Sequence, residues 1–167
     1  MLQLILLVSI MQKAIIFDAG GSGTRVHVYE FTDPTDVSTF TSVLDEEGNP
    51  LYNKSGIPIA SCHNNTENVL ILLNETLGYV NNYINESERG DIPVHILATA
   101  GMRSLPVKEQ TEIYDSLFEV IKSNYSYKVE RQNFRTIEGW EEGLFSWIGI
   151  NHILGTLDGA QETIGMF

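Results

Sequence analysis

The stretch that most constrains the fold is Ile15–Tyr29, in which two apolar runs flank a glycine-rich turn. The first run ends at Asp18, glycines follow at positions 20, 21 and 23, and the second run alternates apolar and polar residues. This pattern predicts a β-hairpin with a carboxylate at its mouth. Glycines allow positive φ and close approach to a ligand, and successive N–H groups in such a turn can bind phosphate. The alternative is an ordinary glycine hairpin with a polar rim, and this stretch alone favours neither.

The net charge of the chain limits the ligands that this turn could bind. It is −12 over 167 residues, which disfavours nucleic acid and anionic membranes as partners. An acidic protein that binds a polyanion such as a nucleotide needs a cation between the two. Asp18 is therefore a candidate to hold a divalent cation, directly or through water, that bridges to phosphate.

Three helices are predicted from apolar residues that recur at three- and four-residue steps, over 66–88, 107–122 and 140–154. Thr66 is the expected N-cap of the first. The residues of the third helix expected to face the core are Leu144, Trp147, Ile148 and Ile153. Trp140 lies seven residues before Trp147, so both tryptophans share one helical face, where core packing is favoured over stacking on a nucleobase.

Short strands are predicted between these helices. Pro93–Ala98 is a continuous apolar run typical of a buried strand. The weaker strand candidates are 39–44, 127–130, 134–137 and the beginning of a strand at 163–167. Residues 49–63, with two prolines and a glycine, are expected to form a surface loop. The order of elements predicts an α/β domain, a mixed sheet packed by helices.

Small or polar residues follow three of the predicted strands, at 18–24, 99–101 and 138–143. The carboxyl ends of strands in α/β sheets are where ligands bind. Thr99 offers a hydroxyl there. Glu141 and Glu142 fall in the first turn of a helix, where acidic residues stabilise the helix dipole. The functional alternative is that one of them faces the cleft as a general base while the other is solvated.

The N-terminal residues and the asparagines bear on where the protein resides. Leu2–Met11 is mostly apolar but shorter than the roughly 20 residues that span a bilayer. A signal remnant over 1–12 and an extension of the first strand both fit it. Five N-x-S/T sequons, where chance gives roughly two, favour the secretory pathway and a glycoprotein. Cys62 is the only cysteine and is expected to be a buried thiol.

Three of these motifs together resemble those of the apyrases, or nucleoside triphosphate diphosphohydrolases. Residues 17–29 resemble the first phosphate-loop motif of that family, 98–103 the second, and 138–151 the third, in the same order. The resemblance covers about residues 13–167. It implies the RNase H-like fold of the actin-like ATPases, a mixed sheet flanked by helices. Residues 24–29 and 161–163 are closer to secretory-pathway nucleoside diphosphatases and plant apyrases than to forms with two membrane anchors.

The resemblance also implies roles for single residues. Glu142 would activate the attacking water, and Asp18 would hold Ca²⁺ or Mg²⁺ through its water shell. The residues that would bind phosphate or place the water are Gly21, Ser22, Gly23, Thr24, Thr99, Ala100 and Gly101. The substrate would be a nucleoside di- or triphosphate, hydrolysed to release inorganic phosphate. Trp140 stands where the family often has a polar residue.

The family continues past the position of Phe167 into an Asp-Leu-Gly-Gly loop and a second domain. The resemblance therefore implies that residues 13–167 form an N-terminal lobe whose structural partner is a C-terminal lobe. We expect the lobe alone to turn over poorly. The implied location is the secretory-pathway lumen, the extracellular space or a membrane anchor in the endoplasmic reticulum or Golgi. The alternatives are a non-catalytic phosphate-binding or interaction module, which could dimerise, and a relative of the sugar kinases or exopolyphosphatases, which the context of Glu142 disfavours.

Overall fold

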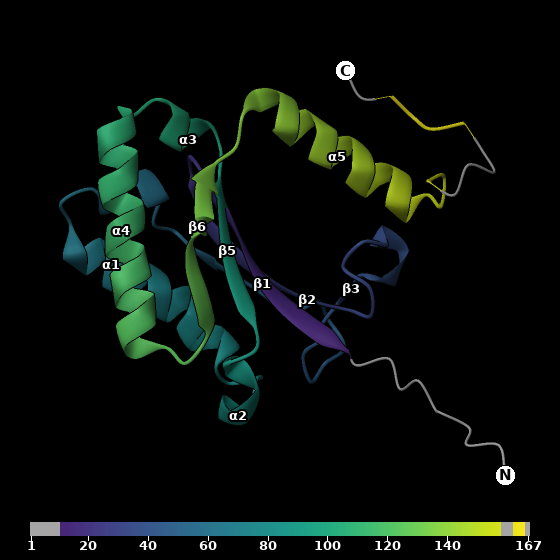
Figure 1. Ribbon diagram of the computed structural model, residues 1–167, viewed down its shortest axis with the longest axis horizontal. Helices are drawn as coiled ribbons and strands as arrows, with labels where there is room; N and C mark the ends of the chain where they lie inside the picture. The colour runs from purple at the N-terminus through teal and green to yellow at the C-terminus, as the bar shows by residue number, and fades with distance from the viewer. Residues whose placement is uncertain (1–10, 158–161, 166–167) are drawn as a thin grey trace, which may run out of the picture.

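A six-stranded mixed β-sheet forms the centre of the computed structural model, which describes residues 11–157 and 162–165 (Figure 1). The strands run in the order β3-β2-β1-β5-β6, and β4 pairs with β2 beside that path. The strand bounds are β1 Gln12–Gly20, β2 Gly23–Phe31, β3 Thr41–Ser42, β4 Tyr52–Ser55, β5 Pro93–Ala98 and β6 Lys128–Thr136. Strands β1 and β2 form the predicted antiparallel hairpin, and β5 is parallel to both β1 and β6.

Helices lie on both sides of this sheet. Their bounds are η1 Val37–Thr39, η2 Ile59–Cys62, α1 Thr66–Leu73, η3 Asn74–Gly78, α2 Glu86–Arg89, α3 Ala100–Arg103, α4 Val107–Asn124 and α5 Gly139–Ile153. Helices α1 and α4 cover one face of the sheet, and α5 lies on the side of the other face (Figure 1). The α/β fold with a mixed sheet flanked by helices is therefore confirmed.

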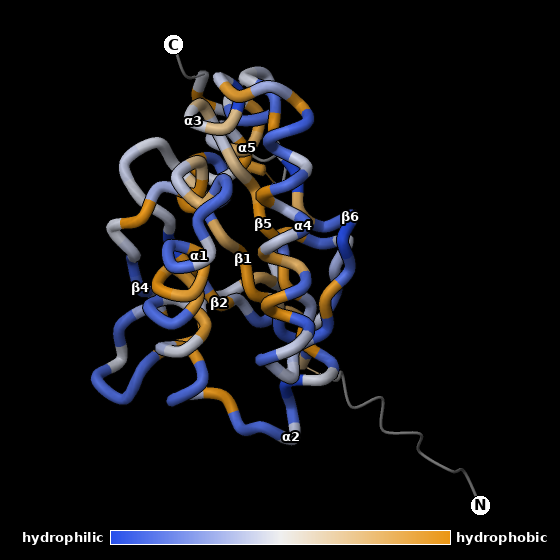
Figure 2. The backbone as a smooth tube through the Cα atoms, turned by 90° about the vertical axis from the view of Figure 1, so that its left-hand side faces the viewer, coloured by the Kyte–Doolittle hydropathy of each residue, from blue (hydrophilic) through white to orange (hydrophobic). Residues whose placement is uncertain are grey.

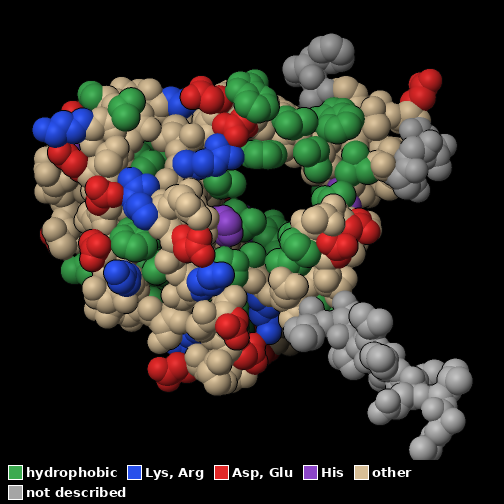
Figure 3. All heavy atoms as spheres, viewed as in Figure 1, with side chains coloured by type: hydrophobic (Ala, Val, Ile, Leu, Met, Phe, Trp, Pro, Cys, Tyr) green, Lys and Arg blue, Asp and Glu red, His purple; other side chains and the backbone are tan. Residues whose placement is uncertain are grey.

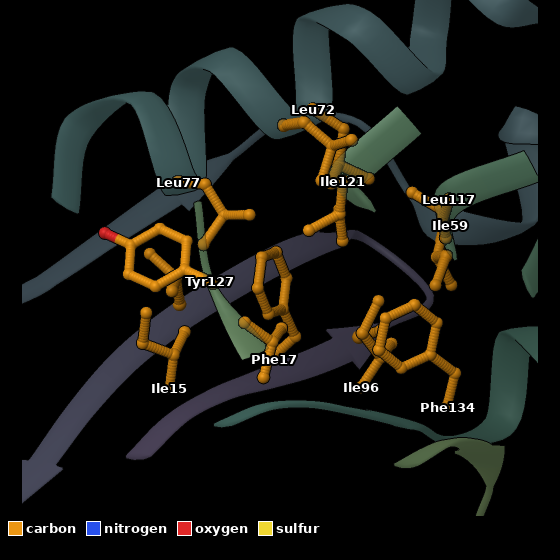
Figure 4. Packing of buried hydrophobic residues seen from close by; sticks show 14 of the residues in the cluster. Ile15, Phe17, Ile59, Leu72, Leu77, Ile96, Leu117, Ile121, Tyr127 and Phe134 are labelled. Carbon is orange, nitrogen blue, oxygen red and sulfur yellow. The ribbon is translucent and has the colours of Figure 1, made fainter. Parts of the chain in front are cut away.

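The core lies between the sheet and the layer of α1 and α4 (Figure 4). Along β1 the side chains of Ile15, Phe17 and Ala19 are fully buried, as the two-residue period of a strand requires. Leu72 and Leu117 pack onto them from the helices. The residues of β1 and β5 are correspondingly hydrophobic, as their orange colour along the tube shows (Figure 2). Cys62 joins this core as predicted, and burial raises the pKa of its thiol to about 11.

The first predicted helix is broken where one long helix was expected, and its N-cap is Asn65, whose side chain accepts from the N–H of Asn68. After α1 the backbone widens into the π-helix η3, in which the buried hydroxyl of Thr76 donates to the carbonyl of Leu72. A turn then leads to α2. The guanidinium of Arg89 donates to the carbonyl oxygens of Asn81 and Ile84 in this turn. These carbonyl groups are thus satisfied where the predicted helix 66–88 is interrupted.

The prediction of a surface loop at 49–63 is wrong. This segment contains β4, which pairs with β2, and η2. Leu51 and Ile59 are 1% exposed and belong to the core. The strands predicted at 127–130 and 134–137 are parts of one continuous strand, β6, whose pairing with β5 shifts register at an irregularity opposite Val94–Ile96. Of the strand expected at 39–44 only Thr41–Ser42 forms.

Two predictions concern the ends of the chain, a strand at 163–167 and a signal remnant at 1–12. No strand is present at 162–165, and residues 166–167 lie outside the described residues. The same is true of residues 1–10, where the signal remnant was expected. Among the described helices none is long and apolar enough to cross a membrane.

The bounds of α5 agree with the prediction, but the prediction of its buried face is wrong. Ile153 is 82% exposed, Trp140 70% and Leu144 42%, and in α5 only Asn151 is buried among the described residues. The reason is that α5 leaves the sheet after its first turn, so a hollow separates its remaining length from the strands (Figure 3). Trp147 and Ile148, which were also assigned to the core, are half-buried, and Ile148 lines the hollow.

Candidate functional site

Two small-residue turns touch each other at the carboxyl ends of β1 and β5. The N–H of Thr99 donates to the carbonyl of Ala19 at 3.1 Å, which ties the two strand ends together. A Cβ on Gly101 would lie 3.1 Å from the Cα of Gly21, so the turns approach as closely as glycine permits. The sequence clusters at 18–24 and 99–101 thus form one continuous surface, as parallel neighbouring strands require.

The predicted phosphate-binding residues differ in exposure: Gly21, Ser22 and Ala100 are exposed, Thr99 and Gly101 are half-buried, and Gly23 and Thr24 are buried. The hydroxyl of Thr24 points inward and donates to the carbonyl of Ile57 at 3.0 Å. Gly23 has φ +143°, and a Cβ there would lie 2.6 Å from the carbonyl oxygen of Ser55. Gly23 and Thr24 therefore fix the shape of the turn, and the exposed residues form its surface.

A pocket of about 310 Å³ opens beside these turns, between the sheet and the start of α5. Asp18, Thr99 and Glu142 all line it, although they come from three separate sequence motifs. Asp18 lies near the carboxyl end of β1, whereas Thr99 and Glu142 follow β5 and β6, and these ends meet at one edge of the sheet. The structure therefore brings together a carboxylate, a hydroxyl and a second carboxylate from three separate motifs.

Glu142 is held by Arg103, the last residue of α3, which follows the turn at Thr99. Its Oε2 accepts from Nη2 of Arg103 at 3.0 Å, and Nη1 of the same guanidinium donates to the carbonyl of Ile137 at 2.9 Å. The Glu142 side chain remains 45% exposed. Arg103 thus links α3 to the start of α5. Sequence reasoning did not assign it a role, although it lies in the 98–103 motif.

Glu141 has a different environment from its neighbour. Its carboxylate accepts from the backbone N–H of Glu138 and from Arg135, completing a capping box at the start of α5. The hydrogen bond from the Glu138 N–H, together with Arg135, lowers the pKa of Glu141. Its side chain is only 16% exposed, so it is not solvated as expected but part of the helix terminus. Glu142 is the glutamate that lines the pocket.

Asp18 pairs with Arg25, its partner across the hairpin, through a bond of 3.3 Å between Oδ2 and Nη1. Its side chain is 48% exposed. The oxygen atoms of Asp18 and Thr99 are the hard ligands that Mg²⁺ and Ca²⁺ prefer. No cluster of three or more His, Cys, Asp or Glu side chains suited to a metal occurs in the part of the chain that the structure describes. Asp18 and Thr99 thus offer one carboxylate and one hydroxyl oxygen to such a cation.

A larger hollow of about 700 Å³ adjoins this pocket under α5, and Asp18 lines both. Its other walls are mainly apolar and include Phe40, Phe145 and Ile148. Burial lowers the pKa of His27 on its floor. The space-filling view shows hydrophobic side chains around this opening (Figure 3).

Comparisons with known proteins agree with this geometry. The sequence profile of the GDA1/CD39 (nucleoside phosphatase) family matches residues 10–167. The nucleoside-triphosphatase ntp-1 of Caenorhabditis elegans is 34% identical over 157 residues, which are 93% of this chain and 29% of that protein. Ectonucleoside triphosphate diphosphohydrolase 4 of Mus musculus is 29% identical over 89% of this chain and 25% of its own length. The chain thus spans less than a third of these relatives.

A solved structure shows the same fold. The crystal structure of nucleoside triphosphate hydrolases from Neospora caninum matches with a TM-score of 0.60, at 16% identity, over 87% of this chain and 32% of that one. The resemblance noted from the three motifs is confirmed by the family profile and by these relatives.

Proposed function

Since the chain belongs to the GDA1/CD39 family of nucleoside phosphatases, we propose that it forms part of an enzyme that hydrolyses nucleoside di- or triphosphates and releases inorganic phosphate. The observation that carries this proposal is the single pocket lined by Asp18, Thr99 and Glu142. The names of the relatives, a nucleoside-triphosphatase and a triphosphate diphosphohydrolase, support the substrate class.

In the proposed reaction Glu142 is the general base. It takes a proton from a water molecule as the water oxygen bonds to the terminal phosphorus, and the bond from phosphorus to the bridging oxygen breaks. The products are inorganic phosphate and the shortened nucleotide. Phosphoryl transfer depends mainly on positioning and on neutralising charge. We propose that the terminal phosphate binds at the turn residues Gly21, Ser22 and Ala100 together with Thr99, and the exposure of the first three supports this.

We propose Asp18 as the residue that holds Ca²⁺ or Mg²⁺, through the water shell of the ion. When bound, such an ion neutralises the charge of the phosphate oxygens, which an acidic chain cannot do with its carboxylates. The half-exposed carboxylate fits this role because it lines the pocket and retains access to water.

The remaining parts of the proposal concern the whole protein. The relatives extend well beyond the matched region, so we propose that a second lobe completes the phosphate clamp and selects the nucleobase. Residues 13–167 would then be an N-terminal lobe with low activity alone. Five sequons and the prefix "ecto" in the name of the mouse relative support a glycoprotein in the secretory-pathway lumen, outside the cell or anchored in the endoplasmic reticulum or Golgi.

A second candidate function is a non-catalytic phosphate-binding or interaction module. The observation that favours it is the apolar surface of α5, where Ile153 and Trp140 are largely exposed. Such a surface invites association with another protein or with a second copy of the chain.

The substitution Glu142→Gln tests the leading proposal, in this chain and in any longer native product that contains it. We expect phosphate release from UDP or ATP to fall by about 10²–10⁴-fold, the usual contribution of a general base. Nucleotide binding, measured by calorimetry, should change little because the shape of the side chain is kept. Glu141→Gln is the matched control and should retain phosphate release, since Glu141 serves the helix terminus. Activity in the Glu142→Gln protein, with loss in the Glu141→Gln protein, would reassign the base to Glu141.

A further inference from the structure

The five sequons fall on one side of the molecule. They begin at Asn53 in β4, Asn64 before α1, Asn74 at the start of η3, Asn85 before α2 and Asn124 at the end of α4. Asn64 and Asn124 thus lie at the ends of α1 and α4, the helices that cover one face of the sheet (Figure 1). Within 11–157 and 162–165, no sequon lies in the two turns, the pocket or α5. The sequons thus fall on β4 and on the elements of the helical layer, and none of their asparagines lines the pocket among the described residues.

We propose that Asn64, Asn74, Asn85 and Asn124 carry N-linked glycans and that Asn53 does not. This inference rests on the proposed secretory location but not on any catalytic role. Four bulky, hydrophilic groups would then cover the layer of α1 and α4, because glycans occupy surface positions. The pocket and α5 would remain free of them.

The four asparagines are exposed in the folded chain. Where their amide nitrogens are engaged, the partners are local. Asn124 Nδ2 donates to Val120 O at 2.9 Å, and Asn85 Nδ2 donates to Glu88 Oε1 at 3.3 Å. In glycosylation the anomeric carbon of an oligosaccharide on a lipid pyrophosphate bonds to Nδ2. The bond from that carbon to the pyrophosphate oxygen breaks, and one amide proton is released. The nitrogen keeps one hydrogen, so a local surface bond can persist or be replaced by water.

Asn53 differs because its side chain joins two elements. It is half-buried in β4, and its Nδ2 donates to the carbonyl of Glu75 in η3 at 2.7 Å. A sugar on that nitrogen would have to fit between β4 and η3, which pack against each other. Ser55, two residues on, is fully buried and also bonds to Glu75, so β4 has little freedom to move away.

Site-resolved mass spectrometry tests the proposal on the native protein, or on the chain expressed with its own N-terminus in a eukaryotic secretory host. Enzymatic removal of N-glycans in H₂¹⁸O converts each occupied asparagine to labelled aspartate. We expect label at positions 64, 74, 85 and 124, and none at Asn53 or at the control Asn82, which is exposed but lacks a sequon. Absence of label at all sequons would overturn the proposal, as would labelling of Asn53 equal to that of the other four.

A second variant tests whether a glycan on α5 would impair secretion or nucleotide binding. Leu144→Asn creates the sequon Asn-Phe-Ser with the existing residues Phe145 and Ser146, both of which line the pocket. We expect its glycan to lower the yield of secreted protein or block nucleotide binding several-fold, while the four natural glycans do neither. Full yield and full binding of a protein shown by mass to be glycosylated at position 144 would contradict this part. Neither readout depends on which residue is the catalytic base.

Discussion

At the scale of single residues, Arg103 makes the contacts that fix the position of Glu142 beside the pocket. Its two terminal nitrogens contact the Ile137 carbonyl and the Glu142 carboxylate, so the guanidinium fixes that glutamate relative to the turn after β5. An arginine presents two donors in a rigid plane, and lysine offers only a point charge. We therefore propose that Arg103 positions Glu142, the proposed base.

We expect Arg103→Gln to lower kcat by about 10–100-fold with a smaller change in KM, because a displaced base slows the reaction more than it weakens binding. Steady-state phosphate release would measure both constants. Arg103→Lys should recover only part of kcat. Arg135→Gln is the matched control, since Arg135 pairs with Glu141 at the helix terminus. An unchanged kcat in the Arg103→Gln protein would show that the contact with Glu142 does not position the base.

How far the site could be predicted also differs from residue to residue. Asp18, Thr99 and Glu142 could be placed together, because each belongs to a cluster at the carboxyl end of a strand, and the carboxyl ends of parallel strands share one edge. The inward orientation of Thr24 could not, since it depends on Ile57 in a segment that reads as a loop. Nor could the role of Arg103, which depends on how closely α3 approaches α5.

At the scale of elements, the hairpin β1–β2 is the part that the sequence predicted best. Alternating apolar residues set its register, and glycines set its turn. β4 escaped prediction because only four residues pair, and they carry no apolar alternation. The prediction of which face of α5 is buried was wrong for another reason. Apolar residues surround this helix, so periodicity gives its length but not the side on which a partner lies.

The tight contact between this hairpin and β4 gives a prediction at the same scale. Gly23→Ala places a Cβ 2.6 Å from the Ser55 carbonyl at φ +143° and should lower the free energy of unfolding by about 1–3 kcal/mol. Gly21→Ala is the control, because its Cβ would meet only the Cα of Gly101, at 4.0 Å. Urea unfolding followed by circular dichroism measures both. Equal stability of the two variants would show that β4 moves away at little cost.

At the scale of the whole molecule, the two sides differ in character. One side carries the helical layer and the five sequons, and the other carries α5 with apolar side chains in solvent. The net charge of −12 opposes non-specific association of chains. Any self-association of the isolated chain should therefore be specific to the apolar side, where α5 and the hollow lie.

Sedimentation velocity over a range of concentrations tests this expectation. We expect the isolated chain to form dimers, and Ile153→Lys to weaken them by about 10–100-fold, because a side chain of this size contributes about 1.5–3 kcal/mol when buried. Val107→Lys is the control. Val107 is 78% exposed, close to the 82% of Ile153, but lies at the start of α4 in the opposite layer. An equal effect of both substitutions would place the contact elsewhere. A chain that stays monomeric at all concentrations would show that the exposed α5 surface does not suffice for dimerisation. That result would remove the support for an interaction module formed by two copies of the chain.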